Sequence, residues 1–195
     1  MTKLIKTIAL AAVFSFATLV AADTVSYSGN TETSADGSWF HPDADFVMLD
    51  RDTTVYSVQT FSVTEDGMYD ITSIQGLNSV DTQFDGMIFL YADAFDPTNG
   101  LMNGVAADDD GAGGSGTSDI LGVSLTAGTT YYLVTTGFTS EDTVFGAATG
   151  PFTNTISGDG DVLLDGSPVP VPAAVWLMIS GLAGLGLFRR KPAQS

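Results

Sequence analysis

The segment from residue 23 to residue 165 lacks any sustained apolar period of 3.6 residues, and this most constrains its fold. Short stretches rich in β-branched and aromatic residues alternate there with Gly, Asn and Asp turn signals. The expected strands are residues 54–63, 68–74, 84–91, 120–125, 130–138 and 150–157. Several short strands at this spacing are typical of an all-β fold, so we expect an antiparallel β-sandwich or jelly roll.

The connections between these strands carry recognisable turn chemistry. Glu65-Asp66-Gly67 separates the first two expected strands and predicts a hairpin between them. Pro97 and Asn99-Gly100 predict a loop after the third strand.

The first 22 residues have the organisation of a secretory signal peptide. Lys3 and Lys6 precede an apolar stretch over residues 8–19, and small residues follow it at 20–22. We expect cleavage before Asp23 and hence export through the inner membrane. The alternative is an uncleaved membrane anchor.

The other end of the chain predicts a membrane-spanning helix. Residues 171–188 carry no charge, and 18 helical residues extend about 27 Å, close to the thickness of a hydrocarbon core. We place a linker at 166–172, the helix at 173–188 and a basic cytoplasmic tail at 189–195. The alternative is a buried helix of the soluble domain.

The local order of residues at this end resembles a known sorting signal. The sequence Val169-Pro170-Val171-Pro172-Ala173, the apolar helix and the cluster Arg189-Arg190-Lys191 are similar to the VPLPA variant of the PEP-CTERM signals of Gram-negative bacteria. The resemblance implies an exosortase-type enzyme as a partner and processing near the Pro motif. After processing, the protein would be released to the cell surface or extracellular matrix; otherwise it stays membrane-anchored with its domain outside.

Charge is strongly segregated along the chain. All 23 acidic residues lie between residues 23 and 165, whereas only one of the six basic residues, Arg51, lies there. The formal charge of this segment is therefore −22, compared with −17 for the whole chain. Such a surface repels nucleic acid and anionic lipid, and it suits a salty medium or divalent cations.

Residues 54–158 resemble a second family, the bacterial pre-peptidase C-terminal (PPC) domains. The resemblance rests on Phe84-Asp-Gly-Met-Ile-Phe-Leu-Tyr91, Ala107-Asp-Asp-Asp-Gly111 and Leu125-Thr-Ala-Gly-Thr-Thr-Tyr-Tyr-Leu-Val134, in that order. It implies a non-catalytic β-sandwich, of a kind that in some cases binds calcium or extracellular polymers. The same implication makes a calcium cofactor a natural hypothesis for this chain.

The acidic stretch 107–119 is the candidate cation site. Calcium takes six to eight oxygen ligands, and alternate residues of a strand share a face. We therefore expect Asp108 and Asp110 to share a site while Asp109 points away, with Asp119 and Asp96 as further ligands and Asp93 and Asp85 as further candidates. The alternative is a solvated acidic loop.

The sequence gives little support to catalysis. The chain has no Cys, so thiolate sites and disulfides are excluded. His41 is the only His, and no Gly-x-Ser-x-Gly nucleophile motif is present. Paired carboxylates could hydrolyse glycosides, but with 23 acidic residues some will be close by chance.

These observations predict an exported, non-catalytic protein with a structural or adhesive role at the cell surface or in an exopolysaccharide matrix. One alternative is a calcium-stabilised module that binds carbohydrate or another polymer. Another is a small secreted hydrolase.

Overall fold

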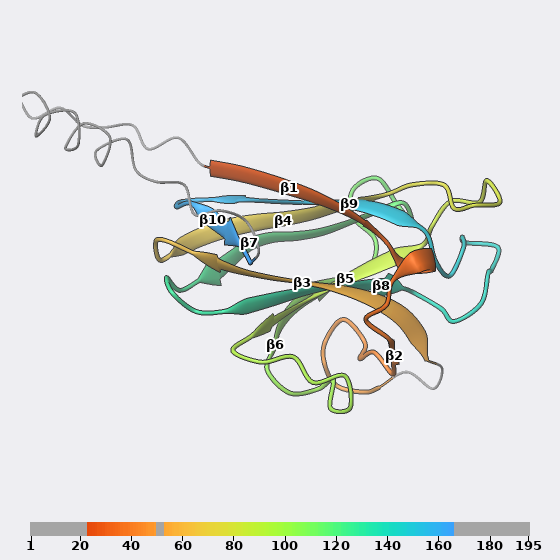
Figure 1. Cartoon of the computed structure of the whole chain (residues 1–195), viewed down its shortest axis with the longest axis horizontal. Helices are drawn as coiled ribbons and strands as arrows, with labels where there is room; N and C mark the ends of the chain where they lie inside the picture. The colour runs from red at the N-terminus through yellow and green to blue at the C-terminus, as the bar shows by residue number, and fades with distance from the viewer. Residues whose placement is uncertain (1–22, 50–52, 166–195) are drawn as a thin grey trace, which may run out of the picture.

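The computed structural model of the chain describes residues 23–49 and 53–165, and these form two antiparallel β-sheets that lie face to face (Figure 1). The predicted signal peptide, linker, membrane helix and basic tail, including the sorting motif, lie outside the described residues. Within the described part of the chain, no helix has the length and apolar character needed to cross a membrane. The expectation of an all-β, antiparallel fold is confirmed for the described residues.

The first sheet has four strands in the order β1-β9-β4-β7. Their bounds are Asp23–Asn30 for β1, Pro151–Gly158 for β9, Gly67–Gln75 for β4 and Thr117–Leu125 for β7.

The second sheet has six strands in the order β10-β3-β8-β5-β6, with β2 paired to the start of β3. Their bounds are Val162–Leu164 for β10, Thr54–Val63 for β3, Tyr131–Gly137 for β8, Gly86–Ala92 for β5, Gly104–Asp108 for β6 and Ser38–Trp39 for β2. A single 3₁₀ turn, η1 (Thr31–Thr33), follows β1.

Without the short strands β2 and β10, eight strands remain, and their order is that of a jelly roll. Counted along the chain, one sheet contains the first, eighth, third and sixth of these strands, and the other contains the second, seventh, fourth and fifth. Strands that are distant in sequence are therefore neighbours, as in the pairing of Asp23 with Gly158.

The predicted hairpin between the first two strands is wrong. β3 pairs with β8 and β10, whereas β4 pairs with β9 and β7, so residues 64–66 cross from one sheet to the other. Both strands carry a buried apolar face, and packing these faces against each other across the sandwich buries more apolar surface than pairing them edge to edge.

Six strands lie where the sequence predicts them, but β1, β2, β6 and β10 were not expected. β6 has the sequence Gly-Val-Ala-Ala-Asp, and its two alanines carry little β signal. β2 and β10 have two and three residues and exist because β3 offers both of them a partner.

The main core lies between the two sheets. β4 illustrates how the sequence builds it, because Tyr69 and Ile71 are buried while the alternate residues Met68 and Asp70 are exposed. Apolar side chains from both sheets complete this core: Phe61, Val63, Ile88, Leu90, Ile120, Leu125, Tyr131, Leu133, Ile156 and Val162.

A second core covers the outer face of the six-stranded sheet. Phe89 and Tyr91 of β5 point to this side, and the ring of Trp39 lies over them with centroid distances of 5.4 and 6.2 Å. Phe46 and Phe95, from the flanking loops, pack against the same cluster. β5 is therefore buried on both faces, although it belongs to an antiparallel sheet.

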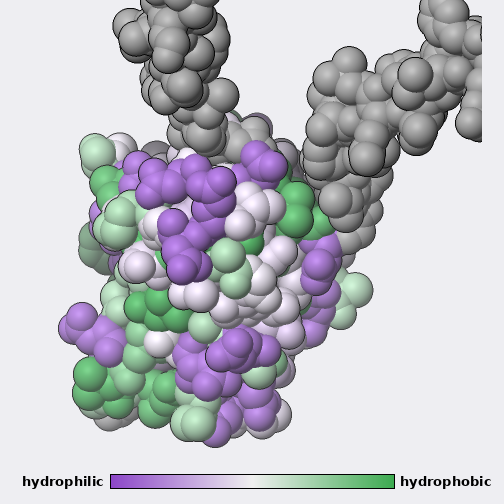
Figure 2. All heavy atoms as spheres, turned by 90° about the vertical axis from the view of Figure 1, so that its left-hand side faces the viewer, coloured by the Kyte–Doolittle hydropathy of each residue, from purple (hydrophilic) through white to green (hydrophobic). Residues whose placement is uncertain are grey.

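The two ends of the sandwich differ. Asp23 and the short strand β10 lie in the left-hand part of Figure 1, whereas loops 76–85, 109–116 and 138–150 lie at the opposite end. Figure 2 looks onto the left-hand end, where hydrophilic residues form several groups with smaller hydrophobic areas between them. The loop end carries the arrangement described next.

Candidate functional site

Three carboxylates meet where β5 begins and β6 ends. Asp85 directly precedes β5, and Asp109 and Asp110 directly follow β6. The antiparallel pairing of Ile88 with Asp108 brings these chain positions to the same end of the strand pair. One carboxylate oxygen from each of the three residues lies within 4.8 Å of the others.

Asp85 and one oxygen of the half-buried Asp109 are shielded from most of the solvent without a hydrogen-bond partner among the described residues. Asp85 is only 4% exposed, and its carboxylate has no hydrogen-bond partner among the described residues. Asp109 Oδ1 is buried and likewise lacks a partner within the described chain. Unpaired buried carboxylates are costly, so the folded chain holds an unfavourable concentration of negative charge here.

The proton affinities of these groups reflect this environment. Burial, and then the neighbouring charges of Asp110, Asp85 and Asp108, raise the pKa of Asp109 to about 7. The pKa of Asp85 is raised as well, first by burial and then by Asp110. The raised pKa values mean that the ionised forms of both carboxyl groups are disfavoured in the folded chain. A bound cation would stabilise those ionised forms.

A buried polar frame holds the backbone beside the cluster. The Ser118 hydroxyl of β7 donates to two backbone carbonyl oxygens. It lies 2.8 Å from that of Gly86 and 2.9 Å from that of Asp109. The Gln75 amide of β4 donates to Ser118 Oγ over 3.0 Å. The opposite sheet therefore fixes the positions from which Asp85 and Asp109 project.

The loop 138–149 passes directly over Asp85. The amide of Asp85 donates to Ala147, and the amide of Phe138 donates to the carbonyl of Asp85. A Cβ placed on Gly146 would lie 2.6 Å from the Cβ of Asp85, so only glycine allows this close approach. The loop encloses the buried member of the cluster.

The structure brings together a different set of residues from the one predicted. Of the four predicted ligands, only Asp110 belongs to the cluster. Asp108 accepts a hydrogen bond from the amide of Asp119, and Asp119 accepts one from the amide of Ala112, so these two carboxylates organise the loop itself. Asp96 lies beyond the other end of β5, where it is exposed and accepts hydrogen bonds from Thr98.

The alternation of side chains along a strand does not extend to Asp109, which was expected to point away from Asp110. β6 ends at Asp108, so residues 109 and 110 leave the strand and no longer point to opposite faces. Asp85 could be recognised in the sequence as a charged residue next to a fully apolar strand. Its meeting with Asp109 depends on the pairing of β5 with β6.

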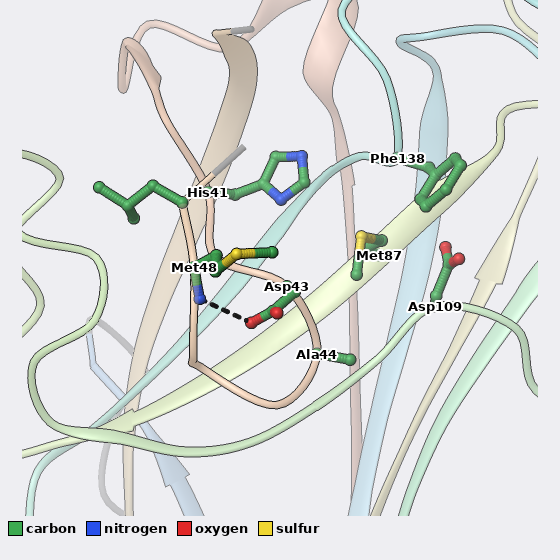
Figure 3. A pocket seen from close by; sticks show the side chains of 8 residues that line it. His41, Asp43, Ala44, Met48, Met87, Asp109 and Phe138 are labelled. Carbon is green, nitrogen blue, oxygen red and sulfur yellow. Dashed lines mark hydrogen bonds between the residues drawn. The ribbon is translucent and has the colours of Figure 1, made fainter. Parts of the chain in front are cut away.

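An apolar groove adjoins the carboxylate cluster and shares Asp109 with it. Its volume is about 390 Å³, and Met48, Met87 and Phe138 point into it (Figure 3). His41, Asp43, Ala44 and Leu49 complete the lining. The amides of Val47 and Met48 donate to Asp43, which fixes the loop that forms one wall.

His41 lies at the edge of this groove. The His41 ring is 3% exposed, and its Nδ1 lies 2.8 Å from the carbonyl of Pro42. The ring also packs 5.6 Å from Phe89 in the outer core. Its position is that of a packed core residue at the edge of the groove.

Comparisons with known proteins add little to this description. No family model matches the chain, and no curated protein sequence matches it. One solved structure with some similarity is PliG of Aeromonas hydrophila, a periplasmic inhibitor of g-type lysozyme. The TM-score is 0.36 at 13% identity, over 75% of this chain and 93% of the other, and a likeness at this level does not bear on function.

Proposed function

We propose that this chain is an exported, non-catalytic jelly-roll protein displayed at the cell surface, with a structural or adhesive role in the surface or exopolysaccharide matrix. Export rests on the signal peptide expected at residues 1–22. Anchoring rests on the helix expected at 173–188, and release rests on processing by an exosortase-type enzyme at Val169–Ala173.

The polarity of the domain is the observation that carries this proposal. The described chain enters at Asp23 and ends after β10 in the same part of the sandwich, while the groove and the carboxylate cluster lie at the opposite end. A domain held through its C-terminal end alone, as expected once the signal peptide is cleaved before Asp23, presents these loops outward. This arrangement suits a protein that contacts an extracellular partner.

The environment of the carboxylates argues against the hydrolase alternative. A glycosidase needs one protonated acid and one carboxylate that hydrogen bonds keep ionised. Here the pKa values of Asp85 and Asp109 are both raised, and neither receives a stabilising hydrogen bond from the described residues. Asp85 and Asp109, shifted in the same direction, do not as a pair divide the roles of acid and nucleophile.

Intact-mass measurement of the protein from cell and medium fractions tests the localisation. We expect the N-terminus at Asp23 in every mature form and a medium form that ends near Pro172. A signal segment retained in every fraction would contradict export with cleavage. A C-terminus at Ser195 in every fraction would contradict processing and leave the anchored form.

The apolar groove favours a second candidate function, binding of carbohydrate or another neutral polymer. Phe138 is 38% exposed and offers a ring face to a ligand in the groove. On a glycan array we expect Phe138→Ala to reduce any binding at least tenfold. Phe145→Ala is the matched control, because Phe145 is 67% exposed and does not line the groove. Equal losses in both variants would contradict a role for the groove.

A further inference from the structure

We propose that Asp85, Asp109 and Asp110 bind a hard divalent cation at the loop end of the sandwich, and that calcium is the cation that fits best. The site differs from the one expected from the sequence. It also stands independently of the cellular role proposed above, because its test needs only the purified chain.

The spacing of the carboxylates matches a shared ion. Calcium–oxygen distances are about 2.3–2.6 Å, so two oxygens bound to the same ion lie at most about 5 Å apart. The three oxygens of Asp85, Asp109 and Asp110 lie within 4.8 Å of one another. A single ion can therefore contact all three after at most small side-chain adjustments, without rearrangement of the strands.

The lack of hydrogen-bond partners for the buried Asp85 and for one oxygen of the half-buried Asp109 is a second, separate indication of a ligand. The carboxylate of Asp85 has no hydrogen-bond partner among the described residues although the residue is 96% buried, and Asp109 Oδ1 is buried and unpartnered as well. Native proteins pair such groups almost without exception, with protein, water or ion partners. Two adjacent orphan carboxylates facing a third indicate a missing positive charge.

The described chain cannot supply that charge itself. Residues 23–49 and 53–165 contain neither Lys nor Arg. The only His of the chain, His41, lies in the outer core and is not one of the three clustered residues. Among the described residues nothing neutralises the cluster, which leaves it open to a cation from solution.

The ligand atoms select a hard cation. The site contains carboxylate oxygens only, without the nitrogen or sulfur ligands that zinc and copper prefer. Three carboxylates offer between three and six oxygens, and water can complete the six to eight that calcium takes. Magnesium demands a stricter octahedron and gives up its water reluctantly, so we expect it to bind more weakly.

Thermal unfolding and calorimetry of the full chain in mild detergent test the site. At 10 mM calcium chloride, compared with EDTA at equal ionic strength set by sodium chloride, we expect Tm to rise by about 3–8 °C. Isothermal titration with calcium chloride should give one site with a Kd of about 0.1–1 mM. Overlapping melting curves together with no saturable heat would overturn the proposal.

Paired variants separate this site from general screening of the acidic domain. Asp85→Asn combined with Asp109→Asn keeps side-chain shape but removes two charges, and it should abolish both the Tm shift and the titration heat. Asp96→Asn is the matched control, since Asp96 is exposed at the other end of β5, and it should retain both. If the double variant keeps the Tm shift and the titration heat, or if Asp96→Asn loses them equally, the assignment is overturned. If the double variant does not fold, Asp110→Asn, whose residue is exposed, must lower calcium affinity at least tenfold.

Discussion

At the scale of single residues, Asp109 links the two features of the loop end. Its carboxylate belongs to the cluster, and its side chain also lines the apolar groove. The titratable groups around it are Asp85, Asp108 and Asp110 on the cluster side and His41 and Asp43 across the groove. All of these except His41 are acidic, and burial together with the charges of Asp110, Asp85 and Asp108 raises the pKa of Asp109 to about 7.

This environment predicts a pH dependence of stability in the absence of cation. The pKa of Asp109 is about 7 in the folded chain, compared with an ordinary value of 3.8, so the folded state binds more protons between about pH 4 and pH 7. Stability should therefore be highest at the acidic end of this window and fall as the pH rises through it. Melting temperatures in EDTA from pH 5 to pH 8 measure the effect.

Asp109→Asn removes the titrating group and should flatten this dependence, leaving only the part that Asp85 contributes in the same direction. Saturating calcium should flatten it as well, because a bound cation favours the ionised form in the folded state. An unchanged slope in Asp109→Asn would show that other groups control the pH response.

At the scale of elements, the short strand β2 determines how the outer face of the second sheet is covered. Trp39 pairs with Thr54 in the backbone ladder, and its ring lies among Tyr56, Phe89 and Phe95. Its indole Nε1 donates to the Thr136 hydroxyl over 3.4 Å. A two-residue strand is thus held by its side chain more than by its backbone pairing.

Trp39→Ala should therefore destabilise the domain by about 3–5 kcal/mol, as expected for removal of a fully buried aromatic side chain. Phe40→Ala is a suitable comparison, because Phe40 is the next residue along the chain and is 47% exposed. We expect it to cost less than about 1 kcal/mol. Urea unfolding of both variants measures the difference, and similar losses would show that the outer cluster is not a structural core.

At the scale of the whole molecule, the apolar faces of the strands produce the fold, whereas residues of the turns and loops carry most of the negative charge. Eight strands form the jelly roll through apolar faces that meet between the sheets. The acidic residues gather in turns and loops, where the ends of strands bring them together. A formal charge of −22 over residues 23–165 therefore opposes folding mainly through its surface, where salt can screen it.

The local strand signals were sufficient to predict much of the fold. The pattern of β3, β4, β5, β7, β8 and β9 is visible because alternation and β-branched residues act within each strand. The partners of these strands could not be derived from such signals. Residues 64–66 have the composition of a hairpin turn, yet they connect two sheets, because the burial of two apolar faces outweighs a local turn preference.

By itself, the sequence determined the class of the fold, the segregation of charge and the positions of most strands, since these depend on residues near one another in the chain. The tertiary structure decided which carboxylates meet. Asp85 and Asp109 are 24 positions apart, and the β5–β6 pairing joins them, while Ser118 and Gly146 from distant elements fix and cover them. A cation site is a matter of a few ångströms between side chains, and only the packed sandwich specifies distances on that scale.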